Sequence, residues 1–220
     1  MFLFLGFLSH LSRAYRWRFQ LEPMGYHIKF GNSMMAVFAT YLINYTIPRA
    51  GEVARASIIT NYEGVPFEKG FGTIVAERIA DLLVMLGIIS ITLFLQFDFI
   101  YGFLIEKFNL TKIVVALAIF ALLIILFLRF IKKSKSKIAL KIRTFVNGLI
   151  EGALSIFKMK KKWAFIFHTL FIWAMYLLMF YVTSLSIEEL DGISLGAILI
   201  GFISASFSIA ATNGGIGSYP

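Results

Sequence analysis

Long apolar runs separated by short charged stretches limit most strongly what this chain can fold into. A membrane-spanning helix needs about 20 consecutive apolar residues. Four segments reach or approach that length: Thr73 to Phe97, Ile113 to Ile131, Ala164 to Ile187, and Ile193 to Ala211. The sequence therefore predicts an all-α, polytopic helical membrane protein. It excludes a soluble nucleic-acid-binding protein, although the net charge is +9, because such a protein would not carry runs of this length.

Basic residues mark the side of the membrane on which loops lie. Of 21 Lys and Arg, eleven lie between Arg129 and Lys162, where Glu151 is the one acidic residue. Residues 132–163 are therefore predicted to be a basic cytoplasmic segment. Within it, apolar positions in 137–157 recur at helical spacing, which indicates an interfacial amphipathic helix on anionic leaflet lipids. A cytosolic helical linker is the alternative. We expect a multi-pass protein of the inner (cytoplasmic) membrane.

The same rule predicts an unusual path for the first third of the chain. Ser9 to Phe30 is basic and should be cytoplasmic, and so should the start of the Thr73–Phe97 span. Met34 to Ile47, which lies between them, covers only about 20 Å of a 30 Å core. A chain that leaves and returns on one face must turn back, so we expect a re-entrant hairpin that turns near Pro48. The alternative is a single Pro-kinked helix whose charges lie among headgroups.

Two breaks in the apolar segments contain residues that could form a binding site. Pro48 suits the first position of a half-helix, along which Arg49, Glu52 and Arg55 recur every three residues. The positive end of such a helix and its arginines suit a phosphate. The second interruption, at the end of the last apolar run, contains Gly214, Gly215 and Gly217, which would let the backbone approach a lipid closely. Paired interruptions of this kind point to a transport site.

A further charged group opens the Thr73–Phe97 span. Glu77, Arg78 and Asp81 are three and four residues apart and can share one helix face. The sequence leaves two interpretations open: the group lines a cavity, or it anchors the helix among headgroups.

Other kinds of site are not indicated by the sequence. Cysteine is absent and the three histidines are isolated, so we expect no metal site, no cofactor and no catalytic residues. Only seven apolar residues, Phe2 to Leu8, precede the first polar ones, and the chain stops soon after the glycine-rich break. We therefore expect a single membrane domain over residues 1–220 that is incomplete at both ends.

These residues resemble one known family. Its motifs occur in order as Ser12-Arg13-Ala14-Tyr15-Arg16-Trp17, Pro48-Arg49-Ala50-Gly51-Glu52 with Arg55, Glu77-Arg78 with Asp81, and Gly214-Gly215-Ile216-Gly217. The ordered set is similar to the lysylphosphatidylglycerol synthase transmembrane (flippase-like) family over essentially the whole chain. Asn213 and Pro220 depart from that family, which often has Pro and Glu there.

The resemblance implies a flippase-like transporter that moves a phospholipid or another lipid-linked phosphate substrate between leaflets. One alternative is the intramembrane part of an aminoacyl-phosphatidylglycerol synthase or of a lipid-linked transferase. Another is a membrane scaffold that transports nothing. The lipid, the energy source and the oligomeric state stay open.

Overall fold

The computed structural model describes residues 2–47, 50–98 and 159–212, together with single residues between 115 and 154. Over these residues the chain is helical and contains no strand, which confirms the predicted all-α class. The α-helices are α1 (Phe2–Leu21), α2 (Phe30–Thr46), α3 (Ala50–Glu63), α4 (Phe67–Leu95), α8 (Lys162–Ser184) and α9 (Leu195–Ala211). Two short 3₁₀ turns, η1 (Glu22–Met24) and η2 (Glu188–Leu190), follow α1 and α8.

Two described helices are long and apolar enough to cross a membrane, α4 with 29 residues and α8 with 23. They coincide with two of the predicted spans, although α4 begins at Phe67, directly after Pro66, and not at Thr73. α9 is apolar but has 17 residues, about 25 Å, so it falls short of a 30 Å core. The predicted span Ile113–Ile131 and most of the basic segment 132–163 lie outside the described residues.

α1 adds to the sequence analysis. Ser9 to Phe30 was expected to be cytoplasmic, which stays a prediction; the structure shows that one helix runs from Phe2 to Leu21. It lies antiparallel to α8: Glu22 contacts Lys161 just before α8, and Arg13 contacts Tyr176 well inside it. Arg13 and Arg16 are buried. Local charge did not reveal this burial, because the carboxylates that pair with these arginines come from α4, far away in the sequence.

α2 and α3 form an antiparallel hairpin, which is the shape predicted from the charge rule. The Glu63 carboxylate at the end of α3 accepts hydrogen bonds from the Lys29 backbone N–H (3.0 Å) and the Asn32 side chain (2.6 Å) at the start of α2. At the turn, a Cβ on Gly51 would collide with the Thr40 carbonyl oxygen and the Asn44 side chain. Glycine therefore sets the close approach of the two helices. How the hairpin lies in a membrane stays a prediction.

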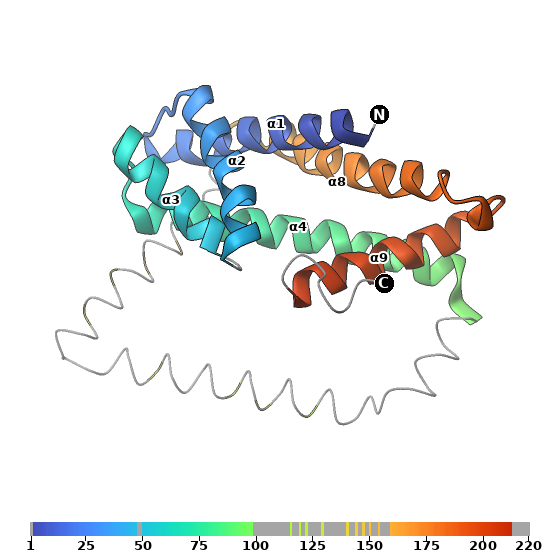
Figure 1. The fold of residues 1–220 in the computed structure, drawn as a ribbon. Coiled ribbons are helices and arrows are strands. Elements are labelled where there is room, and N and C mark those ends of the chain that lie inside the picture. Colours follow the sequence, from blue (N-terminus) through green and yellow to red (C-terminus); the bar gives the residue numbers. More distant parts are fainter. Residues whose placement is uncertain are drawn as a thin grey trace.

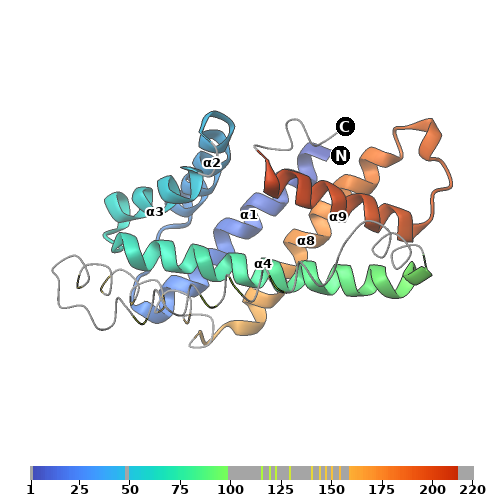
Figure 2. The same cartoon turned by 90° about the horizontal axis from the view of Figure 1, so that it is seen from below.

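One end of the bundle gathers the end of α1 and the starts of α2, α4 and α8; we call it the Lys162 end. Apolar side chains from the first four helices and the connections between them form its core: Trp17, Leu21, Ile28, Ala36, Ala56, Ile59, Val65 and Ile74. From there α1 and α8 run side by side across α4, the α2–α3 hairpin covers the first half of α4, and α9 packs on its second half (Figures 1 and 2).

Candidate functional site

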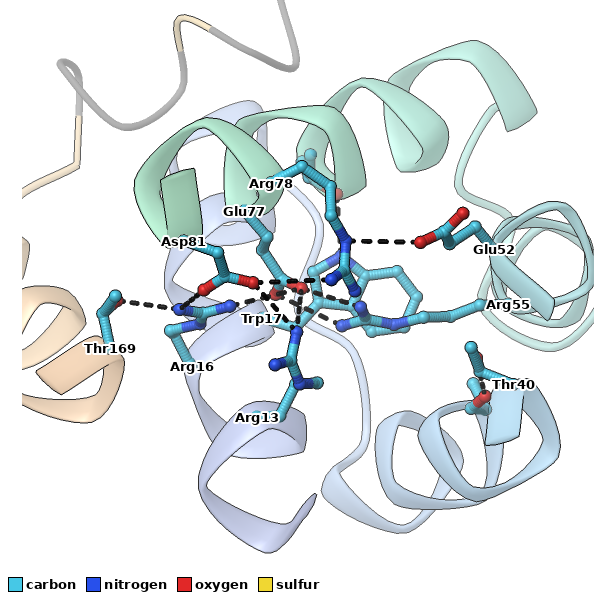
Figure 3. Close-up of polar contacts among 12 residues, drawn as sticks. Arg13, Arg16, Trp17, Thr40, Glu52, Arg55, Glu77, Arg78, Asp81 and Thr169 are labelled. Carbon is cyan, nitrogen blue, oxygen red and sulfur yellow. Dashed lines mark hydrogen bonds and ion pairs between the residues drawn. The ribbon is translucent and has the colours of Figure 1, made fainter. Parts of the chain in front are cut away.

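Charged side chains meet in the interior between α1, α3 and α4 (Figure 3). Each of these residues exposes 6% or less of its surface. We call this set the buried charge network: Arg13 and Arg16 from α1, Arg55 from α3, and Glu77 and Asp81 from α4. Arg13 and Arg16 are three residues apart and Glu77 and Asp81 four apart, so each pair projects from one face of its helix toward the other.

Glu77 joins all three helices. Its two carboxylate oxygens accept hydrogen bonds from the two terminal nitrogens of Arg55, at 2.7 and 3.2 Å. Arg16 Nη2 lies 3.6 Å from the same carboxylate. The Arg55 guanidinium also stacks over the Trp17 ring at 3.8 Å, and Trp17 donates its indole N–H to Thr73 Oγ1 at 2.7 Å. Arg55 is therefore held on two sides, by a carboxylate and by an aromatic face.

Asp81 is the second centre of the network. It accepts from Arg16 Nη1 at 3.1 Å and Arg13 Nη1 at 3.3 Å, and the Trp173 indole N–H on α8 lies 3.4 Å away. Arg16 also donates to Thr169 Oγ1 at 2.8 Å. The carboxylate thus ties α1 and α8 to α4 at one point.

A polar chain leads from the network toward α2. Arg13 Nη2 donates to the Tyr176 hydroxyl at 3.3 Å, and that hydroxyl lies 3.1 Å from the Tyr41 hydroxyl. The two tyrosines come from α8 and α2, so side-chain hydrogen bonds connect the network to α1, α2, α3, α4 and α8.

The network opens to the surface on one edge. Arg78 on α4 pairs with Glu52 on α3 at 3.3 Å and with Asp81 at 3.6 Å. The Arg78 side chain is 48% exposed and the Glu52 side chain 31%. These two residues therefore lie between the buried charges and the surroundings (Figure 3).

The buried charges do not balance. Three guanidinium groups face two carboxylates, and the Arg78–Glu52 pair at the edge adds one charge of each sign. Within the described part of the chain, the Nε atoms of Arg13, Arg16 and Arg55 have no hydrogen-bond partner. An excess positive charge with spare donors in a low-dielectric interior favours an anion nearby.

Burial bears on the two interpretations of Glu77, Arg78 and Asp81. At 1.5 Å per residue, Glu77 and Asp81 lie about 15 and 21 Å along α4 from Phe67. Both point into the bundle and are buried, whereas side chains that anchor a helix among headgroups would be exposed. Of the three residues, only Arg78 is in an exposed position.

The structure brings together five of the residues selected from the sequence: Glu52, Arg55, Glu77, Arg78 and Asp81. The others, Arg49, Gly214, Gly215 and Gly217, lie outside the described residues. Arg55 was expected to face a ligand, but both of its terminal nitrogens are bound to Glu77.

Sequence reasoning missed Arg13 and Arg16 as site residues. A signal was present, since Arg13, Arg16, Trp17 and Gln20 follow the spacing i, i+3, i+4, i+7 of one helix face. All four are buried. The positive charges of this face were used only to assign Ser9 to Phe30 to the cytoplasmic side. Among the described residues, no group of three or more His, Asp or Glu could hold a metal ion.

Two curated proteins are similar to this chain. The UPF0104 membrane protein MJ1595 of Methanocaldococcus jannaschii is 27% identical over 211 residues, which covers 82% of this chain and 61% of the relative. Glycosyltransferase AglD of Haloferax volcanii is 33% identical over 82 residues, which covers 37% of this chain and 13% of the relative. The chain therefore matches less than two thirds of the length of either protein. No solved structure matches it.

The family model described as the lysylphosphatidylglycerol synthase TM region matches residues 1–219. This match agrees with the motifs quoted above and with the apolar helices α4 and α8. The chain is a helical membrane protein and belongs to the lysylphosphatidylglycerol synthase transmembrane-region family.

Proposed function

We propose that this domain is a flippase-like transporter that moves a phospholipid, or another lipid that carries a phosphate, between leaflets. The observation that carries the proposal is the buried charge network, with its excess of arginine inside a membrane domain. Ionisable groups that persist within membrane segments pair with one another and mark substrate pathways. The family supports the same class of function.

We place the domain in the inner membrane with the Lys162 end toward the cytoplasm. The positive-inside rule supports this orientation, because the basic segment that leads into α8 is at that end. The start of α2 and the end of α3 are joined there by Glu63. The α2–α3 hairpin would then enter the membrane and return on the same face.

Within this site, we assign the contact with lipid phosphate to Arg78, with Arg49 as a second candidate. Arg78 is the arginine of the described site that keeps an exposed side chain, and its planar guanidinium suits a phosphate. A phosphate would replace Glu52 or Asp81 as its partner. The lipid would not contact Arg55, which would keep α3 attached to α4 through Glu77.

The test is lipid movement in liposomes that contain the purified protein, a fluorescent phospholipid and an outer-leaflet quencher. A charge-assisted contact is worth about 1.5–3 kcal/mol, so Arg78→Ala should weaken lipid binding by roughly tenfold to a hundredfold and slow transport accordingly. Arg78→Lys should retain part of the activity, because it keeps the charge but loses the planar fork.

Lys162→Ala is the matched control, because it removes one exposed positive charge away from the network. It should transport like the wild type. Wild-type rates in Arg78→Ala would exclude Arg78 from the site. If the wild-type protein moved no lipid at all, the transport proposal itself would be wrong and a scaffold would be favoured.

A second candidate is the membrane part of an enzyme that acts on a lipid-linked substrate. It rests on the 82-residue similarity to Glycosyltransferase AglD. The liposome experiment separates the two functions: a domain that serves a transferase would bind a lipid-linked phosphate with the same dependence on Arg78 but would not carry it to the other leaflet.

A further inference from the structure

A small cavity of about 70 Å³ lies at the Lys162 end, between the end of α1 and the start of α8. Its lining includes two cationic side chains, one carboxylate and three aromatic rings: Arg18, Lys161, Glu22, Tyr15, Phe19 and Tyr26. We call it the interfacial pocket.

The interfacial pocket is separate from the buried charge network. Four residues of the pocket lining follow the spacing i, i+3, i+4, i+7 of one helix face. They are Tyr15, Arg18 and Phe19 on α1 and Glu22 at the start of η1. The residues that enter the network follow the same spacing but begin at Arg13. At about 100° per residue, an offset of two positions places the two sets on roughly opposite sides of the helix.

Arg18 is the available cation of the pocket. Its guanidinium lies over the Tyr15 ring at 5.6 Å, and within the described residues it has no ion pair or hydrogen bond. Lys161 Nζ, in contrast, lies 3.3 Å from both carboxylate oxygens of Glu22 and over the Phe19 ring at 5.8 Å. Arg18, Lys161 and Glu22 together carry one net positive charge, and the stacked tyrosine holds Arg18 in place.

The surroundings of the pocket resemble a membrane surface. Trp163, two residues after Lys161, is 74% exposed, and Tyr15 is 42% exposed. Exposed aromatic rings of this kind gather at the level of lipid headgroups. Basic pockets between membrane helices on the cytoplasmic side bind anionic headgroups. A cavity of about 70 Å³ is several times the roughly 10–15 Å³ that one water needs on the same measure, so it has room for a phosphate group.

We propose that the interfacial pocket binds a phosphate group through Arg18, either the phosphate of an anionic phospholipid in the adjacent leaflet or a free phosphate ion. The site does not depend on lipid transport. Glu22 acts against it, because its carboxylate neutralises Lys161 and repels the anion. Two substitutions in one pocket should therefore have opposite effects on binding.

Native mass spectrometry of the purified chain with phosphatidylglycerol and with phosphatidylcholine tests the proposal. Arg18→Gln should weaken phosphatidylglycerol binding about tenfold to a hundredfold, because one charge-assisted contact is lost. Arg18→Lys should recover part of it. Glu22→Gln should strengthen binding several-fold, because it releases Lys161. Lys162→Gln removes a charge outside the pocket lining and should bind like the wild type.

Inorganic phosphate, added in the absence of anionic lipid, identifies the source. If phosphate alone stabilises the wild type thermally, and Arg18→Gln removes that effect, the ligand is the free ion. If only phosphatidylglycerol shows the dependence on Arg18, the ligand is the lipid. Equal losses in Arg18→Gln and Lys162→Gln would indicate attraction to surface charge alone and would overturn the proposal. Weaker or unchanged binding in Glu22→Gln would also overturn it.

Discussion

At the scale of single residues, position separates arginines that the sequence presents as equivalent. Arg55 and Arg78 both belong to motifs of charged residues, and both pair with glutamates. Arg55 is buried, donates two hydrogen bonds to Glu77 and stacks on Trp17. Arg78 is half exposed and contacts Glu52 through one nitrogen–oxygen pair. Arg55 should therefore contribute mainly to stability, and Arg78 mainly to recognition.

The stability of the two pairs tests this difference. Breaking a buried ion pair leaves an uncompensated buried charge, so Arg55→Met should lower the free energy of unfolding by about 3–5 kcal/mol. Adding Glu77→Gln to Arg55→Met should recover part of this loss. Arg78→Ala should cost under about 1 kcal/mol, because exposed pairs are weak. Unfolding in a detergent titration measures all three variants, and equal losses for Arg55→Met and Arg78→Ala would contradict the assignment.

At the scale of helices, the close contact between α2 and α3 depends on Gly51. The backbone N–H of Gly51 donates to the Asn44 side chain at 2.8 Å, and there is no space for a Cβ beside the Thr40 carbonyl. The contact positions two residues against α4: Glu52, which follows Gly51 directly, and Arg55, one turn further along α3. The hairpin thus determines where two site residues lie.

Gly51→Ala should separate the hairpin and cost about 1–3 kcal/mol, because overpacking forces the backbone to shift. It should also reduce lipid transport, since Glu52 and Arg55 move with α3. Gly87→Ala on α4 is the control: a Cβ there meets nothing within 4 Å, so it should be neutral or stabilise the helix by up to about 1 kcal/mol. Similar effects of the two substitutions would exclude the packing role of Gly51.

At the scale of the whole molecule, the arrangement of the helices decides which segments share a side of the membrane. The end of α3 lies beside the start of α2 in space. α8 runs from the Lys162 end to the acidic turn η2. Lys29 and Asn61 should therefore be on one side and Glu188 on the other.

Single cysteines can test this arrangement directly, because the chain contains none of its own. Lys29→Cys and Asn61→Cys should react with a membrane-impermeant maleimide only after the cells are permeabilised, while Glu188→Cys should react in intact cells. All three positions are exposed. Opposite reactivity of Lys29→Cys and Asn61→Cys would contradict the re-entrant hairpin.

Local properties of the sequence were sufficient to predict the class of protein and part of its architecture. Apolar run length indicated a helical membrane protein, and the distribution of Lys and Arg indicated that the chain turns back between α2 and α3, while its re-entry into a membrane stays a prediction. Both signals can be read within a window of tens of residues, because helix formation and insertion depend on neighbouring side chains. Motif order was likewise sufficient to recognise the family.

Only the tertiary structure decided which charges are paired and which remain available. Arg13 and Arg16 bind Asp81 across 68 and 65 positions of the chain, a separation at which local charge patterns carry no information about partners. Read locally, Arg13 and Arg16 indicated only a basic segment; in the fold they are buried because α4 supplies their carboxylates. Whether an arginine stabilises the bundle or faces a ligand depends on how close the helices pack, and that follows from the whole set of contacts around it.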